Sequence, residues 1–167
     1  SARTARDYGL TESTADKMIS ESVGLLITID CGTNNYESVH RLKQAGIDVI
    51  VVDHHEPAEN LATDAIIVNP KLGMVGRELC SSGLVLKLSL AIVDSFSSFL
   101  RDSFAFAAIG TIADVSPLGI ENRTIVGFGL ECLRSSQHPA LKYLVSKVPP
   151  YEDLDVNAVQ MHIAPRL

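Results

Sequence analysis

Five residues of this chain have types and positions that suit metal-dependent chemistry. Asp30 follows the apolar run LLITI, and the triplet Asp53, His54 and His55 follows the apolar run VIVV. Asp114 follows the uncharged run FAFAAIGTIA, where an unpartnered carboxylate would be costly to bury. Carboxylates and imidazoles without paired thiolates suit Mn²⁺ or Mg²⁺ better than structural zinc. These residue types therefore predict a site for divalent cations.

The same residues also have ordinary structural interpretations. A single aspartate at a strand end often caps a helix or forms a turn, and adjacent histidines can simply be solvated in the loop HHEPAEN. Two neighbouring histidines cannot both be core residues of a strand, because their side chains point to opposite faces. We expect surface or hydrogen-bonded roles for the remaining histidines, His40, His138 and His162.

Cys31 directly follows Asp30 and is a conceivable nucleophile. No Lys, Arg or helix start in its neighbourhood would lower the pKa of the thiol. We therefore expect Cys31 to act as a small buried apolar residue.

Three short apolar runs, LLITID, VIVVD and AIIVNP, lie between Leu25 and Val68 and show no alternation of polar and apolar residues. Such runs are typical of strands that are covered on both faces. The segment from Thr33 to Gly46 carries apolar residues on one helical stripe, with Asn34 as a start signal and Gly46 as a stop. The pattern predicts a βαβ unit and a parallel sheet, whose strand ends meet at one crevice.

The remainder of the chain has helical patterns. A short polar helix is predicted over 11–21, an apolar and mostly buried helix from Ser81 or Ser82 through the stretch that ends at residue 96, and further helices over 101–113, 122–134, 139–145 and from about 156. The fold class is therefore α/β, with a parallel sheet flanked by helices over about 1–75 and a mainly helical part over about 76–167.

Composition excludes several classes of protein. The chain is 46% hydrophobic, so disorder is excluded. Its net charge of 14 − 20 = −6, without blocks of like charge, argues against binding nucleic acid by bulk electrostatics. An anionic substrate would need bridging cations. Three cysteines without a CxxC pair favour a reducing compartment, hence the cytoplasm, and no apolar stretch is long enough for a membrane span.

Longer motifs resemble a known family. The runs LLITIDCGT, GIDVIVVDHHEP, IIVNPK, AAIGTIADVSPLGIENR and IAPRL occur in this order and extend over nearly the whole chain. They are similar to the DHH phosphoesterase superfamily and, within it, to the RecJ single-strand-specific exonucleases. The GTIADV element and the APRL ending favour RecJ over the oligoribonuclease and cyclic-dinucleotide branches.

The resemblance implies roles for the five residues. Asp30 matches the carboxylate that bridges two metal ions, and His54 and Asp114 match ligands of one of those ions. His55 matches the histidine that faces the scissile phosphate, and Asp53 would hold the adjacent loop and orient an imidazole. The resemblance adds no organic cofactor.

One departure from the family pattern affects the activity expected of the chain. The paired aspartates of a DxDG-like first motif are absent, and their place would be before residue 1. The second, DHH-associated domain and a nucleic-acid-binding module are missing after the APRL motif. We expect a partial DHH catalytic domain, truncated at both ends, that binds one ion or none, is inactive by itself, and self-associates through an exposed sheet edge or apolar face.

The function implied for the complete enzyme is a Mn²⁺- or Mg²⁺-dependent phosphodiesterase with two ions, which degrades single-stranded DNA from the 5′ end in recombination and repair. Two alternatives remain open. One is an oligoribonuclease or cyclic-dinucleotide phosphodiesterase of the same superfamily. The other is a non-catalytic DHH-type interaction module.

Overall fold

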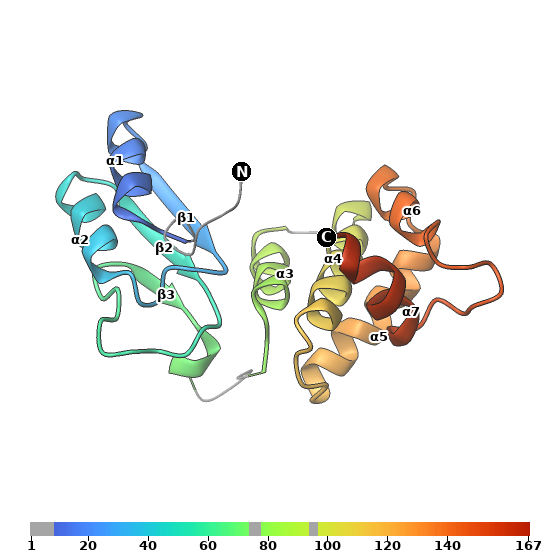
Figure 1. Ribbon diagram of the computed structural model, residues 1–167. Coiled ribbons are helices and arrows are strands. Elements are labelled where there is room, and N and C mark those ends of the chain that lie inside the picture. The colour runs from blue at the N-terminus through green and yellow to red at the C-terminus, as the bar shows by residue number, and fades with distance from the viewer. Residues whose placement is uncertain (1–8, 74–77, 94–96) are drawn as a thin grey trace. The chain divides into compact units, whose positions relative to one another are not determined.

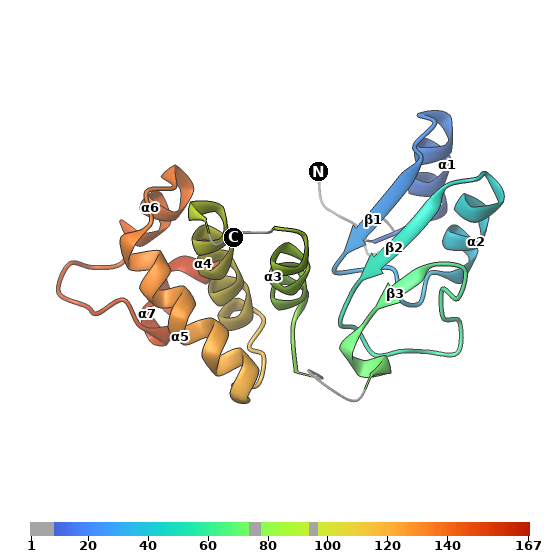
Figure 2. The same ribbon diagram turned by 180° about the vertical axis from the view of Figure 1, so that it is seen from behind.

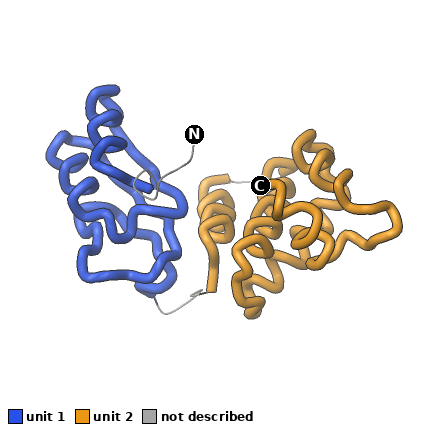
Figure 3. Tube along the Cα trace, in the orientation of Figure 1, with its two compact units in different colours: residues 1–77 blue, residues 78–167 orange. Residues whose placement is uncertain are grey.

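The computed structural model describes residues 9–73, 78–93 and 97–167. The chain divides into two compact units, residues 1–77 and 78–167 (Figures 1 and 3). The described part of unit 1 contains a parallel sheet, two α-helices and a short 3₁₀ turn, whereas the described part of unit 2 is helical. The fold is thus α/β, as the sequence predicts.

The sheet of unit 1 has three parallel strands in the order β1-β2-β3. β1 spans Leu25–Ile29, β2 spans Asp48–Val52 and β3 spans Ile66–Val68. The register pairs Ile29 with Val52 and Val52 with Val68, so the three carboxyl ends lie side by side. Each of the three predicted apolar runs forms a strand of this sheet.

Two helices accompany the sheet. α1 (Glu12–Ser20) begins after Thr11, whose side chain accepts a hydrogen bond from the Thr14 backbone N–H. α2 (Tyr36–Gln44) connects β1 to β2 and begins two residues after the predicted start. The chain leaves α2 through Gly46, whose φ of +82° favours glycine.

One face of the sheet is packed and the other is open. α1 and α2 cover the packed face, where the core residues include Leu10, Val39, Leu42, Val49 and Val51 (Figure 2). On the other face five apolar side chains are 44–66% exposed, namely Leu25, Ile27, Ile29, Ile66 and Val68. The prediction of strands covered on both faces is therefore wrong for the described unit. A continuous apolar run does not distinguish a covered face from an uncovered one.

Unit 2 contains α3 (Ser81–Ile92), α4 (Ser98–Ala113), α5 (Ile120–Ser135), α6 (Pro139–Val145) and α7 (Val156–Ala158). α7 continues into a π-helical turn, Val159–Ile163, and a 3₁₀ turn, Ala164–Arg166. α4 starts three residues before its predicted boundary, and α6 matches its predicted bounds. The predicted end of the α3 helix, residues 94–96, lies outside the described residues.

The core of unit 2 forms between α4, α5 and the elements that follow, with Ile109, Leu133, Leu141 and Ile163 almost fully buried. α4 and α5 approach closely at Gly129, where an added Cβ would lie 2.4 Å from the Phe104 carbonyl oxygen. α3 is less buried than predicted, because Leu88, Leu90 and Ile92 in its second half are exposed. No helix in the described ranges is both long and apolar enough to cross a membrane.

Candidate metal centre

Asp30 occupies the position directly after β1 and has a left-handed backbone, with φ +62°. Aspartate is among the few non-glycine residues that adopt this conformation with modest strain. The Asp30 N–H donates to the Val52 carbonyl at 3.0 Å, which is the last hydrogen bond between β1 and β2 before the chain turns away from the sheet. Its carboxylate is 49% exposed and is therefore accessible to a ligand.

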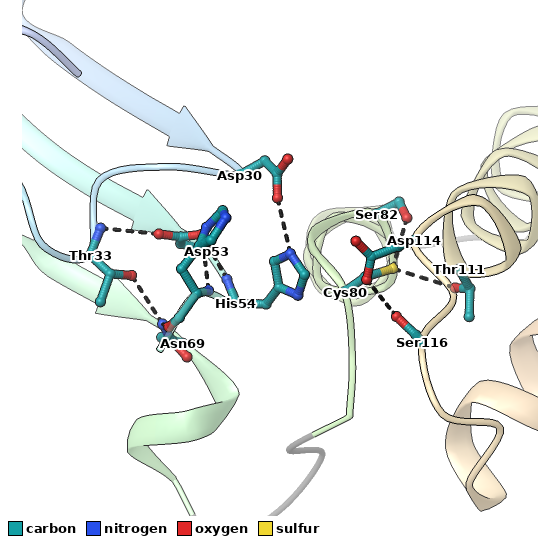
Figure 4. Close-up of polar contacts among 11 residues, drawn as sticks. Asp30, Thr33, Asp53, His54, Asn69, Cys80, Ser82, Thr111, Asp114 and Ser116 are labelled. Atoms are coloured by element: carbon teal, nitrogen blue, oxygen red, sulfur yellow. Dashed lines mark hydrogen bonds and ion pairs between the residues drawn. The ribbon is translucent and has the colours of Figure 1, made fainter. Parts of the chain in front are cut away.

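His54 lies opposite this carboxylate, after β2. The His54 Nε2 atom is 3.2 Å from Asp30 Oδ1, and the His54 side chain is mostly buried (Figure 4). One ligand atom from each of Asp30, His54 and His55 lies within 4.8 Å of the others. Asp30 and His54 thus offer a carboxylate and an imidazole that can share a divalent cation, and the His55 ring lies beside them.

Asp53 is the buried anchor of the loop that follows β2, with only 1% of the residue exposed. Its Oδ2 atom accepts from the Thr33 N–H at 3.1 Å, and its Oδ1 atom accepts from the His54 N–H at 2.8 Å. Burial raises the pKa of Asp53, but hydrogen bonds from Thr33, His55 and the His54 backbone outweigh it and lower the pKa to about 2. Asp53 is therefore ionised at neutral pH.

His55 contacts the Asp53 anchor with one side of its ring, and half of its side chain is exposed. Its Nδ1 atom lies 2.7 Å from Asp53 Oδ1. Because Asp53 is ionised, the Nδ1 atom carries the proton of this hydrogen bond, and Nε2 is the ring atom left to face a ligand or a phosphate.

Asp114 is the C-cap residue of α4 in unit 2. Its Oδ2 atom accepts from the Ser116 hydroxyl at 2.7 Å, and Val115 beside it has φ +54° (Figure 4). Asn122, which is 1% exposed, holds the same loop by donating to the Pro117 carbonyl at 2.8 Å. The assignment of Asp114 to the same metal ion as His54 stays a prediction.

The sequence interpretation gave no role at the site to three polar residues of this region. Thr33 and Asn34 follow β1, and Asn69 follows β3. The Asn34 side chain donates to the Glu56 carbonyl at 2.9 Å and accepts from the Ala58 N–H at 2.8 Å, which clamps the loop after His55. The available signal was their position at strand ends within the motifs CGTNN and VNP.

Cys31 is half-buried. Burial and the charges of Asp53 and Asp30 raise the pKa of its thiol. A protonated thiol is a poor nucleophile, which agrees with the absence of a nucleophilic role for Cys31, although the residue is less buried than predicted.

The three remaining histidines have local partners. His40 Nδ1 lies 2.6 Å from Asp64 Oδ2, and His162 Nε2 lies 3.0 Å from Glu152 Oε2. The His138 ring packs edge-on against Phe106. These contacts agree with the surface or hydrogen-bonded roles expected for them.

A parallel sheet with carboxylate and imidazole side chains gathered where its strands end defines an α/β protein with a candidate divalent-metal centre. The chain belongs to the DHH family: the pattern described as "DHH family, N-terminal domain" matches residues 2–111. This match covers β1, β2 and β3 together with most of α4.

The chain is also similar to curated proteins described as exonucleases that act on single-stranded DNA. The single-stranded-DNA-specific exonuclease RecJ of Bacillus subtilis (strain 168) is 35% identical over 169 residues, which cover 99% of this chain and 21% of that protein. The RecJ of Haemophilus influenzae is 36% identical over 146 residues, which cover 80% of this chain and 25% of that protein. The chain thus spans about a quarter or less of the length of these relatives.

Solved structures show the same fold. RecJ from Thermus thermophilus in complex with Mn²⁺ matches with a TM-score of 0.78 and 28% identity, over 93% of this chain and 24% of that one. An exonuclease RecJ bound to manganese matches with a TM-score of 0.78 and 29% identity, over 97% of this chain and 42% of that one.

Proposed function

We propose that this chain is the metal-binding portion of an exonuclease that degrades single-stranded DNA. The observation that carries the proposal is the cluster of Asp30, His54 and His55 at the strand ends. Its support is the similarity, over 99% of the chain, to a relative described as a single-stranded-DNA-specific exonuclease. The proposal includes 5′-to-3′ polarity and a role in cytoplasmic DNA recombination and repair, for which the RecJ resemblance is the support.

The residues that would hold the cation are Asp30 and His54, and the RecJ resemblance adds Asp114, whereas His55 would face the phosphate. Mn²⁺ is favoured because both matched RecJ structures contain it, and Mg²⁺ suits the same oxygen-rich set. When bound, such ions supply positive charge at the phosphate and lower the pKa of a coordinated water. We propose two ions in the complete enzyme, and one or none in this chain.

The chain's own residues would orient the reacting groups. Asp53 accepts the Nδ1 proton of His55 and so directs His55 Nε2 outward. Nε2 is then positioned to contact the scissile phosphate, while Asp53 itself is too buried to touch the substrate. The net charge of −6 leaves phosphate recognition to bound cations and to local groups.

The test uses a protein that carries this chain within the full length of the RecJ relatives. Replacing His54 or Asp114 by Ala should abolish Mn²⁺-stimulated release of nucleotides from single-stranded DNA. The matched control is His162→Ala, because His162 pairs with Glu152 outside the cluster. Nucleotide release at the wild-type rate by the His54→Ala protein would refute the proposal.

The same assay separates the two other candidates. An oligoribonuclease or cyclic-dinucleotide phosphodiesterase would hydrolyse dinucleotides faster than long single strands. A non-catalytic interaction module would hydrolyse neither and would bind no Mn²⁺ in calorimetric titration. The cluster of potential ligands at the strand ends favours an enzyme over such a module.

Self-association of the isolated chain is a further part of the proposal. In the described sheet β1 and β3 are the edge strands, and five apolar side chains on these two strands are exposed. Light scattering at increasing concentration should show a rising average mass, and Ile27→Lys on this face should reduce it. Ile120→Lys in unit 2 is the control, since Ile120 is 88% exposed outside the sheet. A wild-type chain that stays monomeric would contradict the proposal.

A further inference from the structure

Asn69 is a buried polar residue at the carboxyl end of β3, with only 6% of its surface exposed. It belongs to the motif IIVNPK, to which the proposed function gives no role. Its side chain makes three hydrogen bonds. Nδ2 donates to Thr33 Oγ1 at 3.0 Å and to the His55 carbonyl at 2.9 Å, and Oδ1 accepts from the Lys71 N–H at 2.9 Å.

Both Nδ2 bonds lead to the surroundings of Asp53. Thr33 is fully buried, and its N–H donates to Asp53 Oδ2. His55 donates from its ring to Asp53 Oδ1. Asn69 therefore joins Thr33, which donates to Asp53 Oδ2, to the backbone of His55. The ring of the same His55 contacts the other oxygen of this carboxylate, Oδ1. Figure 4 shows the bonds of Asn69 and Asp53 to Thr33. The loops after all three strands are connected through this one amide.

We propose that Asn69 is a positioning residue of the metal centre: its amide fixes the His55 peptide against the Thr33 loop and thereby sets the direction of the His55 ring. This inference rests on the proposed function for its catalytic consequence. Residues that hold the partners of metal ligands typically affect metal affinity or activity by about 10- to 100-fold.

The chemistry of the position requires an amide. The site needs two hydrogen-bond donors, for Thr33 Oγ1 and the His55 carbonyl, and one acceptor, for the Lys71 N–H. Asparagine supplies this combination on a short side chain. Aspartate of the same shape supplies the acceptor alone and places a second carboxylate beside two oxygens.

A structural alternative makes a different prediction. Asn69 is also the N-cap residue of the 3₁₀ turn Pro70–Leu72, through the bond from Lys71. Aspartate caps helices as well as asparagine does. If capping were its whole role, Asn69→Asp would behave like the wild type. If the two Nδ2 donors position His55, Asn69→Asp would fail although the cap is kept.

The first experiment needs neither metal nor substrate. Side-chain ¹⁵N NMR of the 167-residue chain, with His55 assigned by substitution, reports which ring nitrogen carries the proton. The wild type should show one Nδ1–H form of His55, and Asn69→Asp should show a mixture of both tautomers. Asn157→Asp makes the same change at an exposed position of unit 2 and should leave the His55 signals unchanged.

The second experiment uses the full-length protein with Mn²⁺ and single-stranded DNA. Asn69→Asp should lower kcat by about 10- to 100-fold while KM for DNA changes little. Thr33→Val removes the Oγ1 acceptor without adding charge and should have the same effect, and Thr33→Ser should restore activity because it keeps the hydroxyl. Circular dichroism of each variant checks that it is folded.

The outcomes separate the inference from the proposed function. An inactive wild-type enzyme would overturn the proposed function, and the NMR experiment would still test how His55 is held. An Asn69→Asp protein with the wild-type kcat and a single His55 tautomer would overturn the positioning role. If Asn69→Asp does not fold, the contrast between Thr33→Val and Thr33→Ser decides the question, and equal activity of these two variants refutes the inference.

Discussion

Asp53→Asn should destabilise unit 1, although the substitution changes neither size nor shape. The Asn amide oxygen can replace Oδ1, where the His54 N–H and the His55 ring converge. Its NH₂ group then faces the Thr33 N–H, which donates to Oδ2 in the wild type. Thr33 is fully buried, so this donor cannot find water instead.

The magnitude follows from these bonds. A buried N–H left without an acceptor costs about 1–3 kcal/mol. Hydrogen bonds to a charged acceptor contribute about 1 kcal/mol more than bonds to a neutral one. Replacing the charged Oδ1, which accepts from His54 and His55, by a neutral amide oxygen therefore adds a cost of similar size. We expect unit 1 to lose about 2–4 kcal/mol, a large part of the ~5–15 kcal/mol that stabilises a typical domain.

Urea unfolding followed by far-UV circular dichroism, together with hydrogen exchange of the β2 amides, measures this loss. The control is Asp48→Asn in the same strand, because the Asp48 side chain is 73% exposed and its ion pair is with the exposed Lys43. Asp53→Asn should shift the unfolding midpoint and Asp48→Asn should not. Equal midpoints for Asp53→Asn and the wild type would show that Asp53 does not anchor the loop.

Three further outcomes are expected. The folded-state pKa of Asp53, about 2, lies below the usual 3.8. The ionised carboxylate therefore contributes about 2 kcal/mol to the free energy of unfolding above pH ~4, and this contribution is lost as the pH falls toward 2. Urea titrations should show the difference in unfolding free energy between wild type and Asp53→Asn closing over that range. Gly32→Ala should destabilise unit 1 by about 2–4 kcal/mol in urea, because Gly32 has φ +115° and a Cβ would lie 2.7 Å from Thr28 Oγ1; a shift under ~0.5 kcal/mol would contradict the stated crowding. Leu133→Ala should cost unit 2 about 2–5 kcal/mol in calorimetric unfolding, since Leu133 is 2% exposed, whereas Ile120→Ala should be nearly silent.

The strands and the proximity of Asp30 to His54 were predictable because their signals are local. Apolar runs indicate strands, and a parallel sheet brings the residues after β1 and β2 to one edge. Asp30 Oδ1 and His54 Nε2 accordingly lie 3.2 Å apart, although the two residues are 24 positions apart in the sequence.

The supporting residues were not predictable in the same way. Asn69 and Thr33 are 36 positions apart, and a single Asn or Thr in a loop carries no periodic signal that would relate the two. The open sheet face was also hidden, because Ile27 and Val51 belong to equally apolar runs, yet one is 44% exposed and the other fully buried. Which face is covered depends on packing partners that local sequence does not specify.

The left-handed backbone at Asp30 also affects how such a domain can change during evolution. Asparagine accepts this backbone as readily as aspartate does, whereas β-branched and bulky residues resist it. One substitution, Asp30→Asn, would therefore remove the negative charge and keep the path of the chain. A domain of this family can therefore give up a potential cation ligand at this position in a single step without a change of architecture.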